Sequence, residues 1–252
     1  SWLVNLEADP SRAKALLLAA KADLEKATQL NPKQAGAYAS LSHLYYQTST
    51  NTDINIAAQR ALEADEFLSN ADVILGRLFL SSYDLAQFDK AEQWCGDVRR
   101  RFPASSMAVQ CQLYLLTGRG RNPDVAQAWK LADSIVALAP SPMKVQQRFS
   151  TNLLVAAVLG RASKQQPALA DSALRLARRS EGDATSDATR DLSYTAAFVY
   201  NILGDRKNAL RSLKDYLAAN PQKAEGLRDD AGWWFKDLEQ DAAFRQLVGR
   251  AN

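Results

Sequence analysis

The chain contains few of the residues that mark several common protein classes. Its 252 residues include two cysteines, one histidine, 11 glycines and 8 prolines. A structural zinc site normally takes four Cys or His ligands, and a disulfide-rich scaffold needs more cysteines than these. The scarcity of glycine and proline disfavours collagen-like and turn-rich all-β folds. We therefore expect neither a metal site nor a cofactor.

Charge and hydropathy exclude further classes. The 31 basic and 28 acidic residues give a net charge of +3, which is small for a protein that binds nucleic acid. The longest apolar runs, such as residues 153–159, are much shorter than the roughly 18 residues of a membrane-spanning helix. We expect no nucleic-acid partner and no membrane insertion. Because the sequence opens on Ser1 rather than Met, we interpret it as a piece of a longer protein.

The remaining composition favours helices. Hydrophobic residues make up 47% of the chain and charged residues 23%, a balance typical of a folded domain rather than a disordered segment. Alanine and leucine are abundant, and both are strong helix formers. The composition therefore predicts an all-α fold.

A pattern that ends in proline recurs along the chain and supports a repeat architecture. Small or apolar residues stand at relative positions 0, 4 and 7, which share one helix face, and proline stands at position 12, where it ends the helix. A second amphipathic pattern precedes several copies, so we predict helix pairs. The copies are AKADLEKATQLNP (20–32), AEQWCGDVRRRFP (91–103), AWKLADSIVALAP (128–140) and ALRSLKDYLAANP (209–221).

These paired patterns resemble the tetratricopeptide repeat (TPR) family, whose repeat of about 34 residues carries the motifs W-x2-L-G-x2-Y, A-x3-F and P. The resemblance implies a TPR-like right-handed superhelix of about six antiparallel helix pairs and a C-terminal capping helix, in one domain over residues 1–252. The expected units are repeats 1–34, 35–68, 69–104, 105–142, 143–189 and 190–223, with a cap over 224–252.

The C-terminal segment carries a second resemblance. WFKDLEQDAAFRQLV (234–248) is similar to the end of TPR regions in bacterial multidomain signalling proteins, notably eukaryotic-type Ser/Thr protein kinases. The resemblance implies the sensory or regulatory part of a larger signalling protein. It places the module outside the cytoplasm if the parent is a membrane kinase, and in the cytoplasm otherwise.

The TPR resemblance also implies a non-enzymatic interaction module that binds a protein or peptide segment in a concave groove. Aromatic and arginine side chains carry much of the energy of such interfaces. We therefore expect the strongest contacts at Tyr46, Arg77, Tyr194 and Phe198, with an acidic group of the partner facing Arg77. The groove positions transferred from the family are Ala39, His43, Tyr46, Arg77, Gln112, Tyr194, Phe198 and Asn201.

Two alternative functions remain open at this point. In the first, the protein self-associates through the helix array or through its aromatic cap. In the second, the chain is a structural spacer whose groove holds no ligand. A catalytic role needs a polar triad or a metal cluster, and the sequence offers neither. The chain is therefore not expected to be an enzyme.

The two cysteines leave a further alternative. Cys95 and Cys111 stand on either side of the turn at Pro103. An antiparallel helix pair therefore places them at similar positions along the two helix axes. A disulfide requires Cα atoms within about 7 Å, whereas packed helix axes lie about 8–10 Å apart. We expect buried free thiols, with a disulfide as the alternative.

Overall fold

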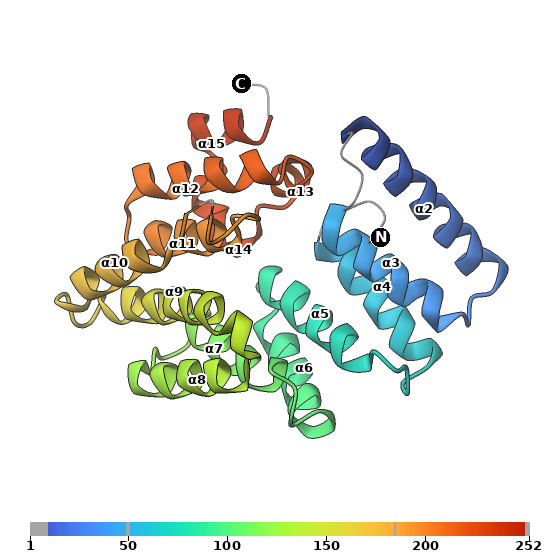
Figure 1. Ribbon diagram of the computed structural model, residues 1–252, viewed down its shortest axis with the longest axis horizontal. Helices are drawn as coiled ribbons and strands as arrows, with labels where there is room; N and C mark the ends of the chain where they lie inside the picture. The colour runs from blue at the N-terminus through green and yellow to red at the C-terminus, as the bar shows by residue number, and fades with distance from the viewer. Residues whose placement is uncertain (1–9, 49–50, 184, 250–252) are drawn as a thin grey trace.

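The computed structural model describes residues 10–48, 51–183 and 185–249 (Figure 1). Within these ranges the chain forms helices and no strand, which confirms the all-α class. Consecutive helices pack in pairs. None of the helices described has the length and hydropathy that a membrane span requires. The helices are α2 (Pro10–Leu30), α3 (Ala35–Thr48), α4 (Asn51–Ala64), α5 (Ala71–Asp84), α6 (Phe88–Arg101), α7 (Met107–Thr117), α8 (Val125–Leu138), η1 (Ser141–Met143), α9 (Lys144–Ala162), α10 (Leu169–Ser180), α11 (Asp191–Ile202), α12 (Arg206–Ala219), α13 (Lys223–Asp229), α14 (Gly232–Phe235), η2 (Lys236–Leu238) and α15 (Ala242–Leu247).

Local sequence signals explain where several helices begin and end. Asp124 and Asp205 begin α8 and α12, because their carboxylates accept hydrogen bonds from the backbone N–H groups of Gln127 (2.8 Å) and Asn208 (3.2 Å). Proline cannot continue a helix, since it lacks the N–H donor and clashes with the preceding turn. The prolines of the recurring pattern stand just beyond the ends of α2, α6, α8 and α12: Pro32, Pro103, Pro140 and Pro221.

The recurring pattern also marks the buried face of these helices. In α6, Ala91, Cys95 and Val98 are all buried against neighbouring helices. Alanine at the first position allows close approach of the two backbones, since its side chain is a single methyl group. The equivalent positions of α8 and α12 are buried in the same way: Ala128, Ala132, Ile135, Ala209, Leu213 and Tyr216.

The helix pairs follow one another along a curved array (Figure 1). Helices α2, α3 and α4 lie at one end and α11 and α12 at the other, while α5 to α10 connect them. Across the inner side of the curve, α13 contacts α3. A large buried cluster runs from α5 through α7, α9 and α11 to α14. The curvature therefore gathers segments from both ends of the chain around one inner space.

The C-terminal segment does more than cap the array. Helix α15 packs on α12, where Arg206 and Asp241 form an ion pair. Helices α13 and α14 instead turn toward the inner side and contact α3, α5 and α11. Trp233 and Trp234 in α14 are each 6% exposed. The segment predicted as a cap thus places its tryptophans inside the curve, because large rings bury more apolar surface between two helices than over the end of an array.

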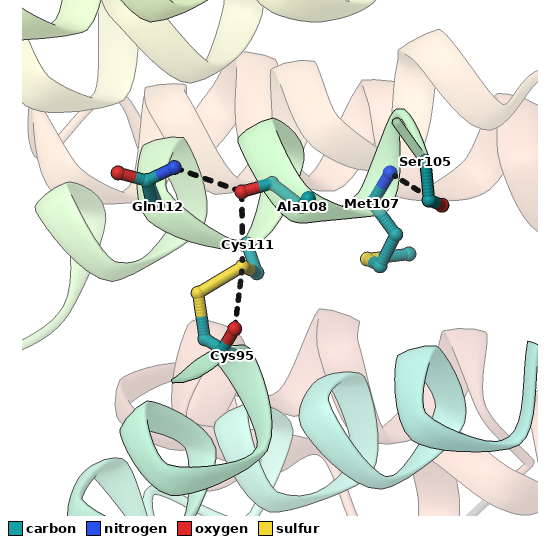
Figure 2. The surroundings of a disulfide bond; sticks show 6 residues. All are labelled: Cys95, Ser105, Met107, Ala108, Cys111 and Gln112. Carbon is teal, nitrogen blue, oxygen red and sulfur yellow. Dashed lines mark hydrogen bonds between the residues drawn. A yellow bond between two sulfur atoms is a disulfide. The ribbon is translucent and has the colours of Figure 1, made fainter. Parts of the chain in front are cut away.

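Cys95 and Cys111 form a disulfide between α6 and α7 (Figure 2), so the expectation of free thiols is wrong. Their Cα atoms are 5.6 Å apart. Each Cα lies about 2.3 Å from its helix axis, so two facing Cα atoms approach much more closely than the axes do. The expectation used the distance between the two helix axes in place of the distance between the two Cα atoms. It did not allow for the displacement of each Cα atom from its helix axis.

We predict that replacing both cysteines by alanine lowers the free energy of unfolding by about 2 kcal/mol, because the bridge restricts the unfolded chain. Urea denaturation of Cys95→Ala/Cys111→Ala beside the oxidised wild type measures the change. The control is wild type unfolded with a reductant, which should match the double variant. Equal midpoints for the oxidised wild type and the variant would show that the bridge adds no stability.

Candidate functional site

The eight groove positions predicted from the sequence do not form one surface. Two of them, Tyr46 and Tyr194, line a cavity of about 430 Å³ on the inner side of the curve. Three others, Ala39, His43 and Arg77, line a separate pocket of about 320 Å³ beside α2, α3 and α5. The remaining three make contacts within the protein and line neither space: Gln112, Phe198 and Asn201.

Arg77 uses its hydrogen-bond donors within the protein. Its Nη1 donates to the carbonyl oxygen of Ala39 (3.2 Å) and to Oγ of Ser42 (2.8 Å). Its Nη2 lies 2.7 Å from Nδ1 of His43, which accepts in the neutral ring. Burial and the charge of Arg77 lower the pKa of His43, which favours the neutral ring. Arg77 is therefore an internal tether of α3 to α5 rather than a free cation facing an acidic partner.

Phe198 and Asn201 support the C-terminal segment. Phe198 is 1% exposed, and its ring stacks on Trp234 with 4.1 Å between the centroids. Nδ2 of Asn201 donates to the carbonyl oxygen of Trp234 (2.7 Å). Gln112 donates instead to the carbonyl oxygen of Ala108 in its own helix (2.8 Å). The chain's own tail thus covers the surface that the sequence assigns to a partner at Phe198.

The tail is fixed by polar contacts as well as by its rings. Nε1 of Trp234 donates to the hydroxyl of Tyr83 (3.3 Å). Nη2 of Arg119 donates to the carbonyl oxygen of Trp233 (3.3 Å) and pairs with Asp237 (3.0 Å). Tyr83 and Trp233 also meet edge to face, with 5.4 Å between the centroids. This segment therefore forms a fixed floor for the inner cavity.

The inner cavity is walled by aromatic rings from four helices and the tail. Tyr194 on α11 lies 4.7 Å from Tyr216 on α12 and 5.4 Å from Trp234, measured between ring centroids. Tyr114 on α7 and Tyr46 on α3 line other parts of the same space. A volume of about 430 Å³ falls within the range of pockets that bind small ligands or single side chains.

The charged side chains of the cavity are mostly acidic. Asp84 ends α5, Asp191 begins α11 and Asp230 follows α13. Lys223, at the start of α13, is the one basic residue among the described residues that line the cavity. Three carboxylates thus share the space with one ammonium group, so the cavity carries negative charge at neutral pH.

Of the three carboxylates in the cavity, Asp84 has the fewest interactions that stabilise its negative charge. Among the described residues its side chain makes no hydrogen bond and no ion pair, whereas Asp230 accepts from the N–H of Gly232 (3.0 Å) and Asp191 from Thr189 (2.8 Å). Burial and the neighbouring charge of Asp230 raise the pKa of Asp84 to about 7, and Lys223 offsets this only in part. Asp84 therefore keeps its proton to a much higher pH than an exposed aspartate does.

Lys223 links the tail to the opposite end of the array. Its Nζ donates to the carbonyl oxygen of Tyr46 and lies 5.0 Å from the centroid of that ring. Burial lowers its pKa to about 8, while Asp191 and Asp84 act in the opposite direction. The ammonium group thus holds α13 against α3 and leaves the carboxylate of Asp84 without an ion pair.

The arrangement is suited to binding a positively charged group. Carboxylates attract a cation directly, and tyrosine and tryptophan faces attract it through their quadrupoles. In the part of the chain that the structure describes, no group of three or more His, Cys, Asp or Glu side chains is placed to hold a metal ion. The aromatic lining of the cavity favours an organic cation presented with apolar surface around it.

The sequence missed the acidic half of this site. The expected groove positions come from the first helix of each pair, whereas Asp84 ends such a helix and Asp230 belongs to the tail. A signal was available for Asp230: the pair Asp229–Asp230 stands one residue before the aromatic run GWWF (232–235). Only the fold brings these distant segments together.

Fold and cavity together define an all-helical array of packed helix pairs with an acidic, aromatic inner cavity. Comparison with protein-family models and with curated proteins returned no match.

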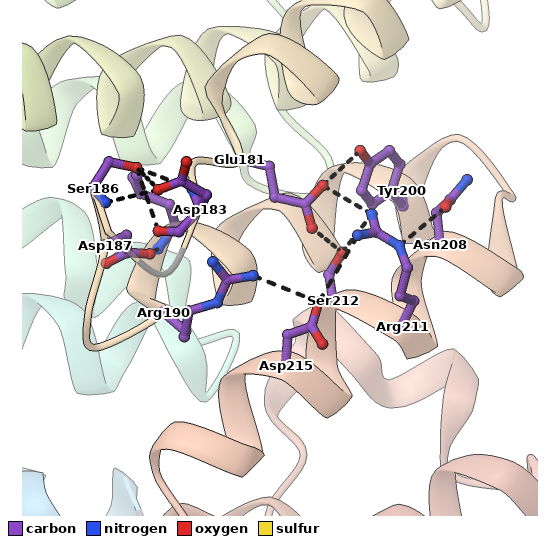
Figure 3. A network of polar contacts seen from close by, with 11 residues as sticks. Glu181, Asp183, Ser186, Asp187, Arg190, Tyr200, Asn208, Arg211, Ser212 and Asp215 are labelled. Atoms are coloured by element: carbon purple, nitrogen blue, oxygen red, sulfur yellow. Dashed lines mark hydrogen bonds and ion pairs between the residues drawn. The ribbon is translucent and has the colours of Figure 1, made fainter.

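A second polar cluster connects α11 and α12 with the segment that follows α10 (Figure 3). Glu181 is 7% exposed and accepts from the hydroxyls of Tyr200 (3.1 Å) and Ser212 (2.5 Å) and from Nη2 of Arg211 (2.8 Å). Nearby, Oδ2 of the buried Asp187 accepts from the first turn of α11 (2.8 Å). All of these groups have partners within the fold, so we assign the cluster a structural role in closing the long α10–α11 connection.

We predict that Glu181→Gln lowers the free energy of unfolding by about 2 kcal/mol. The amide keeps the volume of Glu181 but loses the charge that strengthens its hydrogen bonds, and it leaves the cation of Arg211 less compensated. Urea denaturation measures the effect. Glu92→Gln is the matched control: Glu92 pairs with Arg121 on the exposed surface and should contribute under about 1 kcal/mol. Equal losses in the two variants would contradict the structural role.

Proposed function

We propose that this chain is a non-enzymatic, TPR-like interaction module that binds a segment of another protein in the inner cavity. The observation that carries the proposal is the cavity itself: about 430 Å³, open on the inner side of the array and lined by rings from helices at both ends of the chain. Aromatic side chains in such positions contribute most of the energy of protein interfaces. Two of the predicted contacts, Tyr46 and Tyr194, line it.

We further propose that the module is the sensory or regulatory part of a larger bacterial signalling protein, on the resemblance of residues 234–248. The Cys95–Cys111 disulfide favours an oxidising compartment for this module, because cytosolic thiols are kept reduced. This supports an extracytoplasmic position in the parent protein.

Selection of phage-displayed random peptides tests the binding function. Ser150→Trp on α9 fills part of the cavity, whereas Ser134→Trp makes the same change on the exposed surface of α8, outside the cavity. We expect peptides that bind wild type and Ser134→Trp with equal affinity and lose at least ten-fold with Ser150→Trp. Circular dichroism confirms that both variants remain helical.

The competing functions give different results in this selection. Peptides that bind all three proteins equally would place the binding surface outside the cavity. A failure to enrich any peptide, with a molar mass in light scattering that rises with concentration, would favour self-association. A failure to enrich any peptide with a constant monomer mass would favour a spacer.

A further inference from the structure

The charge distribution of the inner cavity indicates the chemistry of its occupant. Asp84 and Asp230 both line the inner cavity, and the charge of Asp230 disfavours the ionised form of Asp84. Two carboxylates that repel each other gain from a cation placed between them, since one positive group compensates both. Lys223, the one basic side chain among the described residues that line the cavity, donates to the carbonyl oxygen of Tyr46 and compensates Asp84 only in part.

The walls select among organic cations. A guanidinium group is planar, stacks on aromatic faces and presents paired donors to carboxylates, whereas an ammonium group is a compact, strongly hydrated charge. The cavity offers aromatic faces for stacking and carboxylates for the paired donors. The rings are those of Tyr46, Tyr194 and Trp234, and the carboxylates are those of Asp84 and Asp230. This combination favours arginine over lysine.

We propose that the occupant of the cavity is a partner segment carrying an arginine, whose guanidinium group is held by Asp84 and Asp230 against the tyrosine and tryptophan walls. This inference rests on the proposed binding function and specifies its ligand. Such a ligand is opposite in charge to the acidic group expected from the sequence at Arg77.

Binding should depend on pH through Asp84, because the bound guanidinium requires the ionised carboxylate. With a pKa of about 7 in the free protein, affinity rises roughly eight-fold from pH 6 to pH 7.5. Lys223, whose pKa is about 8, stays mostly charged over this interval. The ionisable groups that line the cavity together with Asp84 are Asp191, Asp230, Lys223, Tyr46, Tyr114, Tyr194 and Tyr216.

Two acetylated and amidated pentapeptides test the proposal: Ala-Ala-Arg-Ala-Ala and the same peptide with neutral citrulline in place of arginine. Isothermal titration calorimetry compares them on wild type, on Asp84→Asn and on Asp171→Asn, a matched charge change at an exposed position of α10. We expect wild type and Asp171→Asn to prefer the arginine peptide at least ten-fold. Asp84→Asn should lose both the preference and the pH dependence.

The outcomes separate this inference from the function on which it rests. Equal affinity of wild type for both pentapeptides, an unchanged preference in Asp84→Asn, or no measurable binding of the arginine pentapeptide would overturn the arginine proposal. Selected peptides that still require an unblocked cavity would leave the binding function standing. Dimerisation of wild type that Asp84→Asn abolishes would make a second copy the occupant, and would also overturn the proposal.

Discussion

Replacing Trp234 by alanine should lower the free energy of unfolding by about 4 kcal/mol, near the upper end of the range for a buried aromatic residue. The ring stacks on Phe198, lies 5.4 Å from Tyr194 and donates to the hydroxyl of Tyr83. Alanine removes all three contacts and leaves a cavity between α5 and α11. The loss should exceed that from the disulfide or from Glu181, because Trp234 bridges α5 and α11 through three contacts.

Urea denaturation measures this loss, and Trp129→Ala is the matched control. Trp129 on α8 is 38% exposed, so its replacement should lower the free energy of unfolding by under about 1 kcal/mol. If Trp234→Ala proves no more destabilising than Trp129→Ala, the tail is not part of the folded core. The inner cavity would then have no fixed floor.

Replacing Asp84 by asparagine should stabilise the protein by about 3 kcal/mol more at pH 8 than at pH 5. Burial and the charge of Asp230 raise the pKa of this carboxyl from its ordinary value of 3.8 to about 7. Between these values the folded chain holds a proton that the unfolded chain has released, so stability falls as pH rises through the interval. Asparagine cannot ionise and avoids this loss.

Guanidinium chloride denaturation at pH 5 and pH 8 measures the effect. Asp171→Asn, which makes the same change on an exposed surface, should alter stability little at either pH. A change in stability in Asp84→Asn that is equal at the two pH values would contradict the raised pKa of this unpaired, half-buried carboxylate. If Asp84→Asn is more stable than wild type but no longer binds the arginine peptide, Asp84 lowers the stability of the fold and is needed for binding.

The helices could be predicted from the sequence because their signals are local. Pro103 ends α6 and Pro140 ends α8 through the chemistry of the residue itself. The buried face of α6 follows from the spacing of Ala91, Cys95 and Val98 along one helix. None of these inferences requires knowledge of a distant segment.

The site could be predicted only in part, because its remaining members come from segments far apart in the chain. Tyr46 and Tyr194 follow from the face of a first helix, and both line the cavity. Phe198 lies one turn beyond Tyr194 on the same helix, but Trp234 covers it. The same tail brings Asp230 toward Asp84, so neither the lost contact nor the acidic pair is visible in any local pattern.

The indole N–H signals of the five tryptophans offer the most direct test of binding in the inner cavity. Trp233 and Trp234 line the cavity, whereas Trp94 and Trp129 lie outside it. A titration with the arginine pentapeptide, followed by two-dimensional ¹H–¹⁵N NMR, should shift the signals of Trp233 and Trp234 and leave those of Trp94 and Trp129 in place. Shifts confined to Trp94 or Trp129, or no shift at all, would contradict binding in this cavity.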